Sequence, residues 1–252
     1  AHAHATTIDV NLKLPLKLLY KTQLKKVANN YWGCGIDSIK FYFGKKVIDT
    51  NNYLVIRNAI EEERFLFDLE KRNQLRKQYS LDGKFVIGNV ARFMKQKNHT
   101  FTLDLFKKIH DINKDSVLML LGDGELLEEM KLKAKELGIE NSVMFMGNVD
   151  NTNEMYQAMD LFLLPSLFEG LPVVGIEAQA AGLKCIMSDT ITKEVEITNN
   201  VEFISLNASI GKWVESILNK KNYERKNMKD AIINAGYSIS VEAKKLQKTV
   251  QK

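Results

Sequence analysis

The sequence predicts an α/β fold built on a doubly wound parallel sheet. From residue 84 onward, short apolar runs alternate with amphipathic helical patterns, which is the order of repeated strand and helix units. Strands joined through helices lie parallel, with right-handed crossovers. Polar and glycine residues follow successive apolar runs, and ligands bind at this carboxyl edge of such sheets. The 252 residues suffice for one large α/β unit or for a domain and a half.

Six apolar runs are predicted as the strands of this sheet, at residues 85–90, 116–121, 143–146, 161–164, 185–187 and 202–206. After the first run, Phe101, Leu105 and Ile109 recur at four-residue spacing and predict a helix. Further helices are predicted at 126–137, 154–159 and 172–181. Gly138 is suited to end the first of these three, because glycine adopts the left-handed conformation at helix ends.

The segment before residue 84 is organised differently. Residues 12–27 predict a basic amphipathic helix, whose lysines recur every four residues (Lys13, Lys17, Lys21 and Lys25). Such a helix either presents a solvated face or contacts an anionic membrane surface. The remaining predictions are a strand at 53–56, a charged linker and helix at 61–79, and a lysine-rich helix at 240–252.

Composition narrows the class of protein. With 45% hydrophobic and 27% charged residues the chain is globular. No apolar run approaches the roughly 18 residues of a spanning helix, so we expect a cytoplasmic protein. The net charge of +5 is too mild and scattered to predict nucleic-acid binding, although it suits an anionic ligand. Cys34 and Cys185 have no metal-like spacing, and Cys185 is interpreted as a core residue.

Five predicted loops follow the strands at one edge of the sheet, at 91–99, 122–125, 147–150, 165–171 and 188–190. They carry most of the polar and glycine residues of interest, namely Arg92, Lys97, Asp123, Glu125, Gly147, Ser166 and Glu169. One loop of this composition would mean little. Five at one edge predict a binding crevice.

The stretch 168–182 holds two carboxylates around a predicted helix start near Pro172, with Glu169 on the loop and Glu177 inside the helix. Free amides at the helix start can receive a phosphate, and those predicted to do so belong to Gly170, Leu171 and Val173. Carboxylates can accept hydrogen bonds from sugar hydroxyls. Alternatively both glutamates are solvated. The apolar and small residues around Glu177 argue against that alternative, because a charge there needs a partner.

The assembled motifs resemble the retaining glycosyltransferases of family four, which have the two-domain GT-B fold. The family signature is two glutamates separated by seven residues, met here by Glu169 and Glu177. Other segments that resemble family motifs are VIRNAI, NVARF with QKNH, LLGDGE, NSVMFMG and GYSISVEAKKL. The resemblance is nearest to bacterial enzymes of capsular and exopolysaccharide assembly, and it covers nearly the whole chain.

The resemblance implies a division of the chain. Residues 1–58 would be a remnant of the amino-terminal, acceptor-side domain, and 59–83 an interdomain linker and helix. Residues 84–220 would be the Rossmann-like domain that binds the nucleotide sugar. Residues 221–252 would form carboxyl-terminal helices that return to the amino-terminal domain. On this basis we expect the chain to be a fragment that lacks most of the amino-terminal domain.

The resemblance also implies roles for individual residues. Arg92 and Lys97 would contact the diphosphate and stabilise the leaving nucleotide, because fixed cations lower the barrier to its departure. Glu169 would accept from a hydroxyl of the donor sugar, and Glu177 from the ribose. The expected nucleotide contacts also include Gly122, Asp123, Met146 and Gly147. The expected phosphate and sugar contacts are Ser166, Gly170, Leu171, Pro172 and Val173.

Three histidines are interpreted separately. HAH at the start of the chain resembles the family segment that ends in an active-site histidine, and this role falls on His4. The alternative is that His4 is an exposed residue near a terminus. His99, after the phosphate loop, and His110, near a helix end, are interpreted as structural.

The resemblance therefore implies a metal-independent, retaining transfer of a hexosyl residue. The donor would be a nucleoside-diphosphate sugar, most simply a uridine one, and the acceptor a glycan or a lipid-linked glycan. The enzyme would be cytoplasmic or peripheral at the inner face of the cell membrane, with no nucleic-acid partner. Two alternatives stay open. One is a sugar-nucleotide epimerase of the same fold, and the other is a nucleotide-binding half-enzyme that is inactive without an upstream domain.

Overall fold

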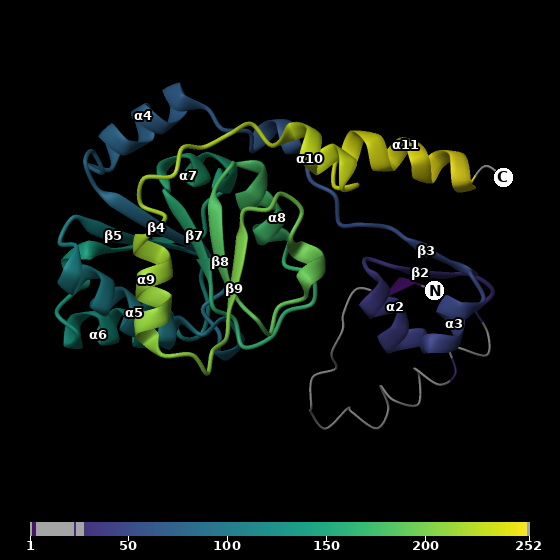
Figure 1. The fold of residues 1–252 in the computed structure, drawn as a ribbon, viewed down its shortest axis with the longest axis horizontal. Helices are drawn as coiled ribbons and strands as arrows, with labels where there is room; N and C mark the ends of the chain where they lie inside the picture. The colour runs from purple at the N-terminus through teal and green to yellow at the C-terminus, as the bar shows by residue number, and fades with distance from the viewer. Residues whose placement is uncertain (1, 4–22, 24–27, 251–252) are drawn as a thin grey trace.

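The structure is a computed structural model, and it describes residues 2–3, 23 and 28–250. His4 and, apart from Gln23, the predicted helix 12–27 lie outside the described residues. The described chain forms a large α/β unit and a smaller one beside it (Figure 1). No helix of the described residues is long and apolar enough to cross a membrane.

The large unit is built on a six-stranded parallel sheet with the order β6-β5-β4-β7-β8-β9. Its strands are β4 Phe85–Val90, β5 Ser116–Leu121, β6 Val143–Gly147, β7 Leu161–Leu164, β8 Lys184–Ser188 and β9 Val201–Ile204. The strand order reverses between β4 and β7, because the chain moves outward to β6 and then returns to the other side of β4. Such a reversal opens a crevice at the carboxyl ends of the strands. The predicted doubly wound α/β fold is thus confirmed.

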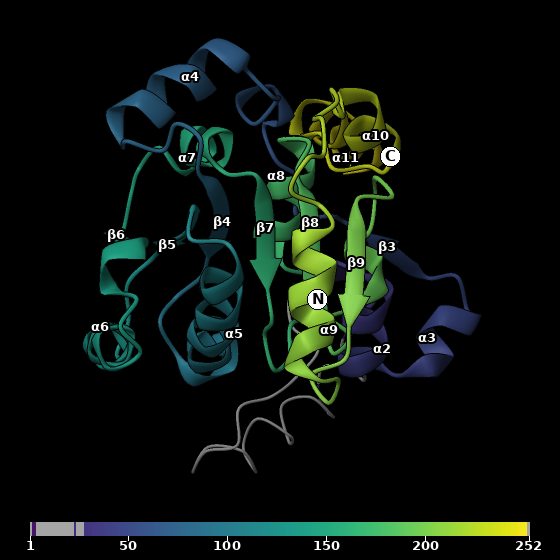
Figure 2. The same ribbon diagram turned by 60° about the vertical axis from the view of Figure 1, so that its left-hand side comes forward.

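Helices cover both faces of this sheet (Figure 2). One face packs against α5 His99–Ile112, α6 Leu127–Glu136 and α9 Ile210–Leu218. The other packs against α7 Thr152–Ala158 and α8 Val173–Ala180, with α4 Leu69–Gln78 and α10 Lys229–Asn234 outside them. Short 3-10 turns occur at η1 Glu62–Arg64, η2 Lys95–Lys97, η3 Glu140–Ser142 and η4 Lys193–Val195.

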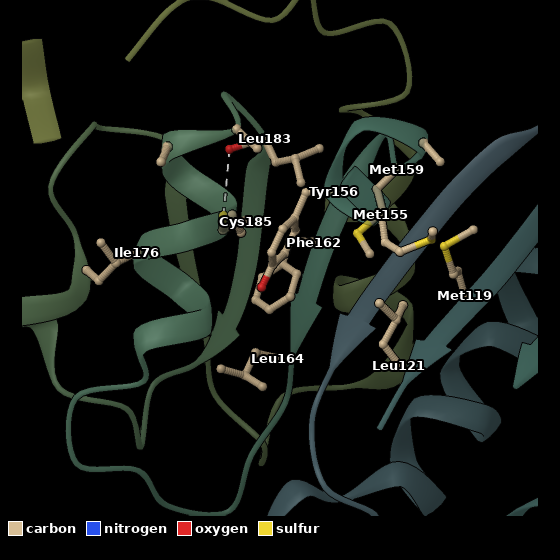
Figure 3. Close-up of a cluster of buried hydrophobic side chains, with 14 of the residues drawn as sticks. Met119, Leu121, Met155, Tyr156, Met159, Phe162, Leu164, Ile176, Leu183 and Cys185 are labelled. Atoms are coloured by element: carbon tan, nitrogen blue, oxygen red, sulfur yellow. Dashed lines mark hydrogen bonds between the residues drawn. The ribbon is translucent and has the colours of Figure 1, made fainter. Parts of the chain in front are cut away.

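The strands alternate between two hydrophobic clusters, one on each face. Leu118 and Leu120 belong to the cluster beneath α5, whereas Met119 and Leu121 belong to the cluster beneath α7 and α8. Figure 3 shows the second cluster, in which Tyr156 of α7 lies against Phe162 of β7. Because both faces are buried, the strands are nearly continuous apolar runs, which is why the sequence predicts them well.

The smaller unit has a three-stranded parallel sheet, formed by β1 His2–Ala3, β2 Tyr31–Gly33 and β3 Tyr53–Val55. It also contains α2 Ile36–Phe43 and α3 Lys45–Asp49. The carboxyl-terminal helix α11 Ile239–Val250 begins where the linker passes, since Ile60 pairs with Ser238 and the Ser238 hydroxyl donates to Glu62 Oε1 at 2.8 Å. The segment that precedes the large unit and the segment that follows it are therefore hydrogen-bonded to each other.

Several predicted elements are confirmed, with shifts at their ends. The strands predicted at 85–90, 116–121 and 161–164 have the observed bounds, and the others differ by one or two residues. The helix predicted from Pro172 begins instead at Val173, because Pro172 keeps an extended conformation with ψ of 108°. Pro172 is thus the residue before the helix, not its first residue. Cys185 is fully buried, as expected.

Two of the strand-end loops meet at a glycine. The Gly122 amide donates to the Gly147 carbonyl at 2.8 Å, which joins the ends of β5 and β6. A Cβ atom at Gly122 would lie 2.2 Å from the Ala91 carbonyl oxygen, and the φ of Gly122 is +132°. Only glycine combines that backbone conformation with so close an approach. The loops that follow β4, β5 and β6 are therefore packed against one another at the carboxyl edge of the sheet.

Candidate functional site

A pocket of about 600 Å³ opens at the carboxyl ends of β4, β5 and β6. Its lining residues are Val90, Ala91, Arg92, Lys97, Leu121, Gly122, Asp123, Gly124, Asn148, Val149, Thr152 and Val174. Four residues singled out in the sequence are among them, since Arg92, Lys97, Gly122 and Asp123 all face this space. The pocket lies at the reversal of strand order, where this class of sheet binds its ligands.

The two predicted cations of the pocket differ in their surroundings. Arg92 is exposed and forms no ion pair with any described residue. Lys97 is paired, because its Nζ lies 2.5 Å from Glu169 Oε1. The Lys97 side chain is 18% exposed and that of Glu169 only 7%, so the pair is largely shielded from water. The two residues that the sequence assigned to diphosphate and sugar thus contact each other directly.

Further hydrogen bonds join the loops that carry this pair. Besides Lys97, Glu169 accepts from the Ser166 hydroxyl at 2.7 Å. Gln96 donates through Nε2 to the Phe168 carbonyl at 2.8 Å, and its own carbonyl accepts from the Leu167 amide at 2.8 Å. Asn98 Nδ2 donates to the carbonyl of Pro165 at 3.1 Å. The loop after β4 and the loop after β7 therefore form a single hydrogen-bonded unit.

The start of α8 presents unused donors at the same edge. The amides of Gly170, Leu171 and Val173 donate to no acceptor among the described residues. They stand at the positive end of the helix dipole, where an anion is favoured. Val174, in the first turn of α8, is among the residues that line the pocket, whereas Gly170, Leu171 and Val173 are not. The helix start can therefore hold a phosphate beside Arg92 and Lys97.

Glu177 lies one turn further along α8 and is partly buried. The Tyr156 hydroxyl donates to its Oε2 at 2.9 Å, and no lysine or arginine among the described residues pairs with it. Burial raises the pKa of Glu177 above its usual value, whereas the hydrogen bond from Tyr156 lowers it. The hydrogen-bond partner of the partly buried Glu177 carboxylate is thus the neutral phenol of Tyr156.

Other predicted residues shape the edge of the pocket. Asp123 Oδ1 accepts from the Gly124 amide at 2.7 Å, which stabilises its own turn. Met146 and Gly147, at the end of β6, are absent from the described pocket lining, whereas Asn148 and Val149 after them are present. Sequence reasoning missed these two residues, together with Thr152, Val174, Gln96, Asn98 and Tyr156. All seven are uncharged, and Asn148, Val149, Thr152 and Tyr156 lie outside the quoted motifs, whereas Gln96 and Asn98 lie within QKNH and Val174 within the stretch 168–182.

A second pocket of about 550 Å³ lies beside the first. It is lined by Asp37, Glu169, Asp189, Thr190, Ile191, Thr192, Lys193 and Glu194. Asp37 belongs to α2 of the smaller unit and Lys193 to η4 of the larger one, so this pocket lies between the two units. Lys97 lines the first pocket and Glu169 the second. The ion pair therefore lies where the two pockets meet.

Chemically, the first pocket offers cations, helix amides and turn glycines, and the second offers mostly acidic and hydroxyl side chains. The first combination suits a diphosphate, and the second suits the hydroxyls of a sugar. Within the part of the chain that the structure describes, no group of three or more His, Cys, Asp or Glu residues could hold a metal ion. His4 falls outside that part.

Comparison with known proteins identifies the family. The family model described as "Glycosyl transferases group 1" matches residues 71–238, and the chain belongs to this family. The putative glycosyltransferase EpsF of Bacillus subtilis (strain 168) is 32% identical over 244 residues, which cover 94% of this chain and 64% of EpsF. The chain thus spans less than two thirds of that relative's length.

Another relative has a more specific name. The UDP-Gal:alpha-D-GlcNAc-diphosphoundecaprenol alpha-1,3-galactosyltransferase of Escherichia coli is 28% identical over 211 residues, which cover 79% of this chain and 54% of that enzyme. Among solved structures, HepE of Anabaena in complex with UDP superimposes with a TM-score of 0.79 at 16% identity, over 99% of this chain and 71% of HepE. These neighbours confirm the predicted GT-B class of fold.

His99 begins α5 directly behind the loop that carries Lys97 and is 2% exposed. Its ring stacks on Phe93 with centroids 4.1 Å apart, and neither ring nitrogen has a hydrogen-bond partner among the described residues. Burial, and then the charge of Lys97, lower the pKa of His99 from 6.5 to about 4. His99 is therefore a neutral support for the loop, as its structural interpretation predicted.

The pKa of His99 predicts a loss of stability in acid. Between pH 6.5 and 4 the unfolded chain binds a proton that the folded chain does not, so stability falls as the pH falls. Between pH 7 and pH 5 the wild type should lose about 2 kcal/mol more than His99→Phe, which keeps a ring against Phe93. Urea unfolding at both pH values measures this, and equal losses in the two proteins would contradict it.

Proposed function

We propose that this chain binds the donor in a retaining glycosyltransferase that moves a hexosyl residue from a UDP-sugar to a glycan or lipid-linked acceptor. Its place would be in the synthesis of a cell-surface polysaccharide, at the inner face of the membrane. Residues 84–220 would hold the nucleotide sugar, and residues 1–58 would belong to the acceptor side. The names of the relatives, which include glycosyltransferases and a Vi polysaccharide biosynthesis protein of Salmonella typhi, support this reaction class.

One observation carries the proposal, namely the Lys97–Glu169 ion pair at the meeting of the two pockets. A nucleotide sugar has its negative diphosphate next to its neutral, hydroxyl-rich sugar. A cation on the first pocket and a carboxylate on the second match this order of groups. Arg92 adds a second positive charge, and the free amides at the start of α8 add donors. HepE, with which the chain shares its fold, has been crystallised with UDP and with UDP-glucose.

In the proposed reaction these groups act on the leaving diphosphate. As the bond between the anomeric carbon and the diphosphate oxygen breaks, negative charge grows on that oxygen. Arg92, Lys97 and the helix amides stabilise this charge where it develops, which lowers the barrier. The acceptor oxygen then bonds to the anomeric carbon, and its proton passes to the leaving phosphate. Transfer on one face in this way retains the anomeric configuration without a protein nucleophile.

The two glutamates position the donor in this proposal. Glu169 is held by Lys97 and Ser166, so its remaining lone pairs can accept from sugar hydroxyls. Glu177 has only Tyr156 as a described side-chain partner, so it can accept from the ribose. In this proposal neither glutamate acts as a general acid or base. Glu169 accepts hydrogen bonds from Lys97 and Ser166, and Glu177 accepts one from Tyr156.

Removal of Glu177 should weaken nucleotide binding. Calorimetric titration of UDP against Glu177→Ala should show a loss of about 1 to 3 kcal/mol, as when a charged hydrogen-bond partner is removed. Glu128→Ala is the matched control, because Glu128 on α6 is 79% exposed and lies outside both pockets. The control should bind UDP as the wild type does. An unchanged affinity in Glu177→Ala would refute the assignment of Glu177 to the ribose.

Lys97 should act on the transfer step. In the full-length protein, release of UDP from UDP-glucose or UDP-galactose should slow about 100-fold in Lys97→Ala, as when one charge-stabilising donor is lost. Lys95→Ala changes an exposed lysine in the same turn that lines neither pocket, and it should keep the wild-type rate. Equal rates in the two variants, or a transferred sugar of inverted configuration by NMR, would contradict the proposal.

A further inference from the structure

The Tyr156 side chain lies beneath the site, on a helix that no family motif marks. Tyr156 belongs to α7 and is fully buried. Its hydroxyl donates to Glu177 Oε2 at 2.9 Å and lies 3.3 Å from the Val174 carbonyl. A phenol has one proton to donate, and the shorter contact to a carboxylate is the stronger of the two. The hydroxyl therefore connects the hydrophobic core to Glu177.

The ring of Tyr156 has little freedom to move. It packs against Phe162 of β7 with centroids 5.9 Å apart (Figure 3). It also packs against Phe65 with centroids 6.0 Å apart. Burial, and then the nearby charge of Glu177, raise the pKa of Tyr156 above its ordinary value, so the hydroxyl remains a donor. A fixed ring with a fixed donor sets the direction in which Glu177 Oε2 points.

The neutrality of this partner matters for what Glu177 can bind. A lysine or arginine beside a carboxylate would compete with a ligand hydroxyl for its lone pairs, and none among the described residues pairs with Glu177. The phenol occupies one oxygen and leaves Oε1 without a described partner. Val174, three residues earlier on α8, lines the first pocket, and residues three apart share a helix face. Glu177 itself is not among the residues that line the pocket, but it shares a face of α8 with Val174, where Oε1 can receive a ligand group that reaches past Val174.

We propose that Tyr156 is a positioning residue for the nucleotide, whose hydroxyl holds Glu177 so that the second carboxylate oxygen receives the ribose hydroxyls. This inference rests on the proposed function, which assigns the ribose to Glu177. It adds a residue that contacts no ligand and yet determines how the ribose is bound. Its effect should therefore depend on whether the ligand has ribose hydroxyls.

The test compares two ligands in one variant. Tyr156→Phe removes only the hydroxyl and keeps the ring in the core. Its affinity for UDP should fall about threefold to tenfold, within the range for the loss of one ordinary hydrogen bond. The variant and the wild type should bind 2′,3′-dideoxyuridine diphosphate with equal affinity, because this ligand has no ribose hydroxyl for Glu177 to bind. Tyr79→Phe is the matched control, since Tyr79 is a partly buried tyrosine at the end of α4, outside both pockets.

Three outcomes would overturn the inference. An equal loss of affinity for both ligands, or a Tyr156→Phe chain that no longer folds, would show that the hydroxyl has only a structural role. No loss of affinity for either ligand would show that the hydroxyl is dispensable. A double-mutant cycle adds a second measurement, because Tyr156→Phe should have no further effect on UDP affinity in a Glu177→Ala background. If Glu177→Ala alone leaves UDP affinity unchanged, the ribose assignment itself fails. If only Tyr156→Phe is silent, the assignment stands and the positioning role fails.

Discussion

A shielded ion pair between Lys97 and Glu169 joins the two halves of the candidate site. It unites the loop after β4 with the loop after β7, and Gln96, Asn98 and Ser166 reinforce it with hydrogen bonds. Removal of one partner from a buried pair leaves an uncompensated charge, at a cost of about 3 to 5 kcal/mol. A ligand that brings its own negative charge to Lys97 and its own donors to Glu169 avoids that cost. The pair therefore favours a ligand with an anionic part beside a hydroxyl-rich part.

The fold explains why these groups meet. Strand order reverses between β4 and β7, so the loops that follow these two strands lie side by side at the carboxyl edge of the sheet. The glycine at position 122 lets the neighbouring loop pack directly against the Ala91 carbonyl, which closes one wall of the first pocket. On the other side, α8 directs its free amides towards the same edge, and Tyr156 holds Glu177 from within the core. Hydrogen bonds between the strand-end loops thus hold Lys97 and Glu169, and α7 and α8 hold Glu177.

Sequence reasoning succeeded where burial leaves a strong pattern. The runs at β4, β5 and β7 are buried on both faces, so their apolar stretches have clear ends. It also placed Arg92, Lys97 and Glu169 on strand-end loops, because polar residues after apolar runs are conspicuous. It could not pair Lys97 with Glu169, since 72 residues separate them and only the sheet order brings them together. Tyr156 looked like any core aromatic, because its role depends on the direction of one hydroxyl. The strand β2 was missed because its sequence, YWG, ends in glycine and contains no aliphatic run like that of β3.

The central claim is that the Lys97–Glu169 pair lies where the diphosphate and the sugar of a bound nucleotide sugar meet. A crystal structure of the chain with UDP bound tests this most directly. The account predicts diphosphate oxygens within hydrogen-bond distance of Lys97 Nζ and Arg92, and ribose hydroxyls within hydrogen-bond distance of Glu177. UDP bound at another edge of the sheet, or in the first pocket with the diphosphate away from Lys97, would contradict it.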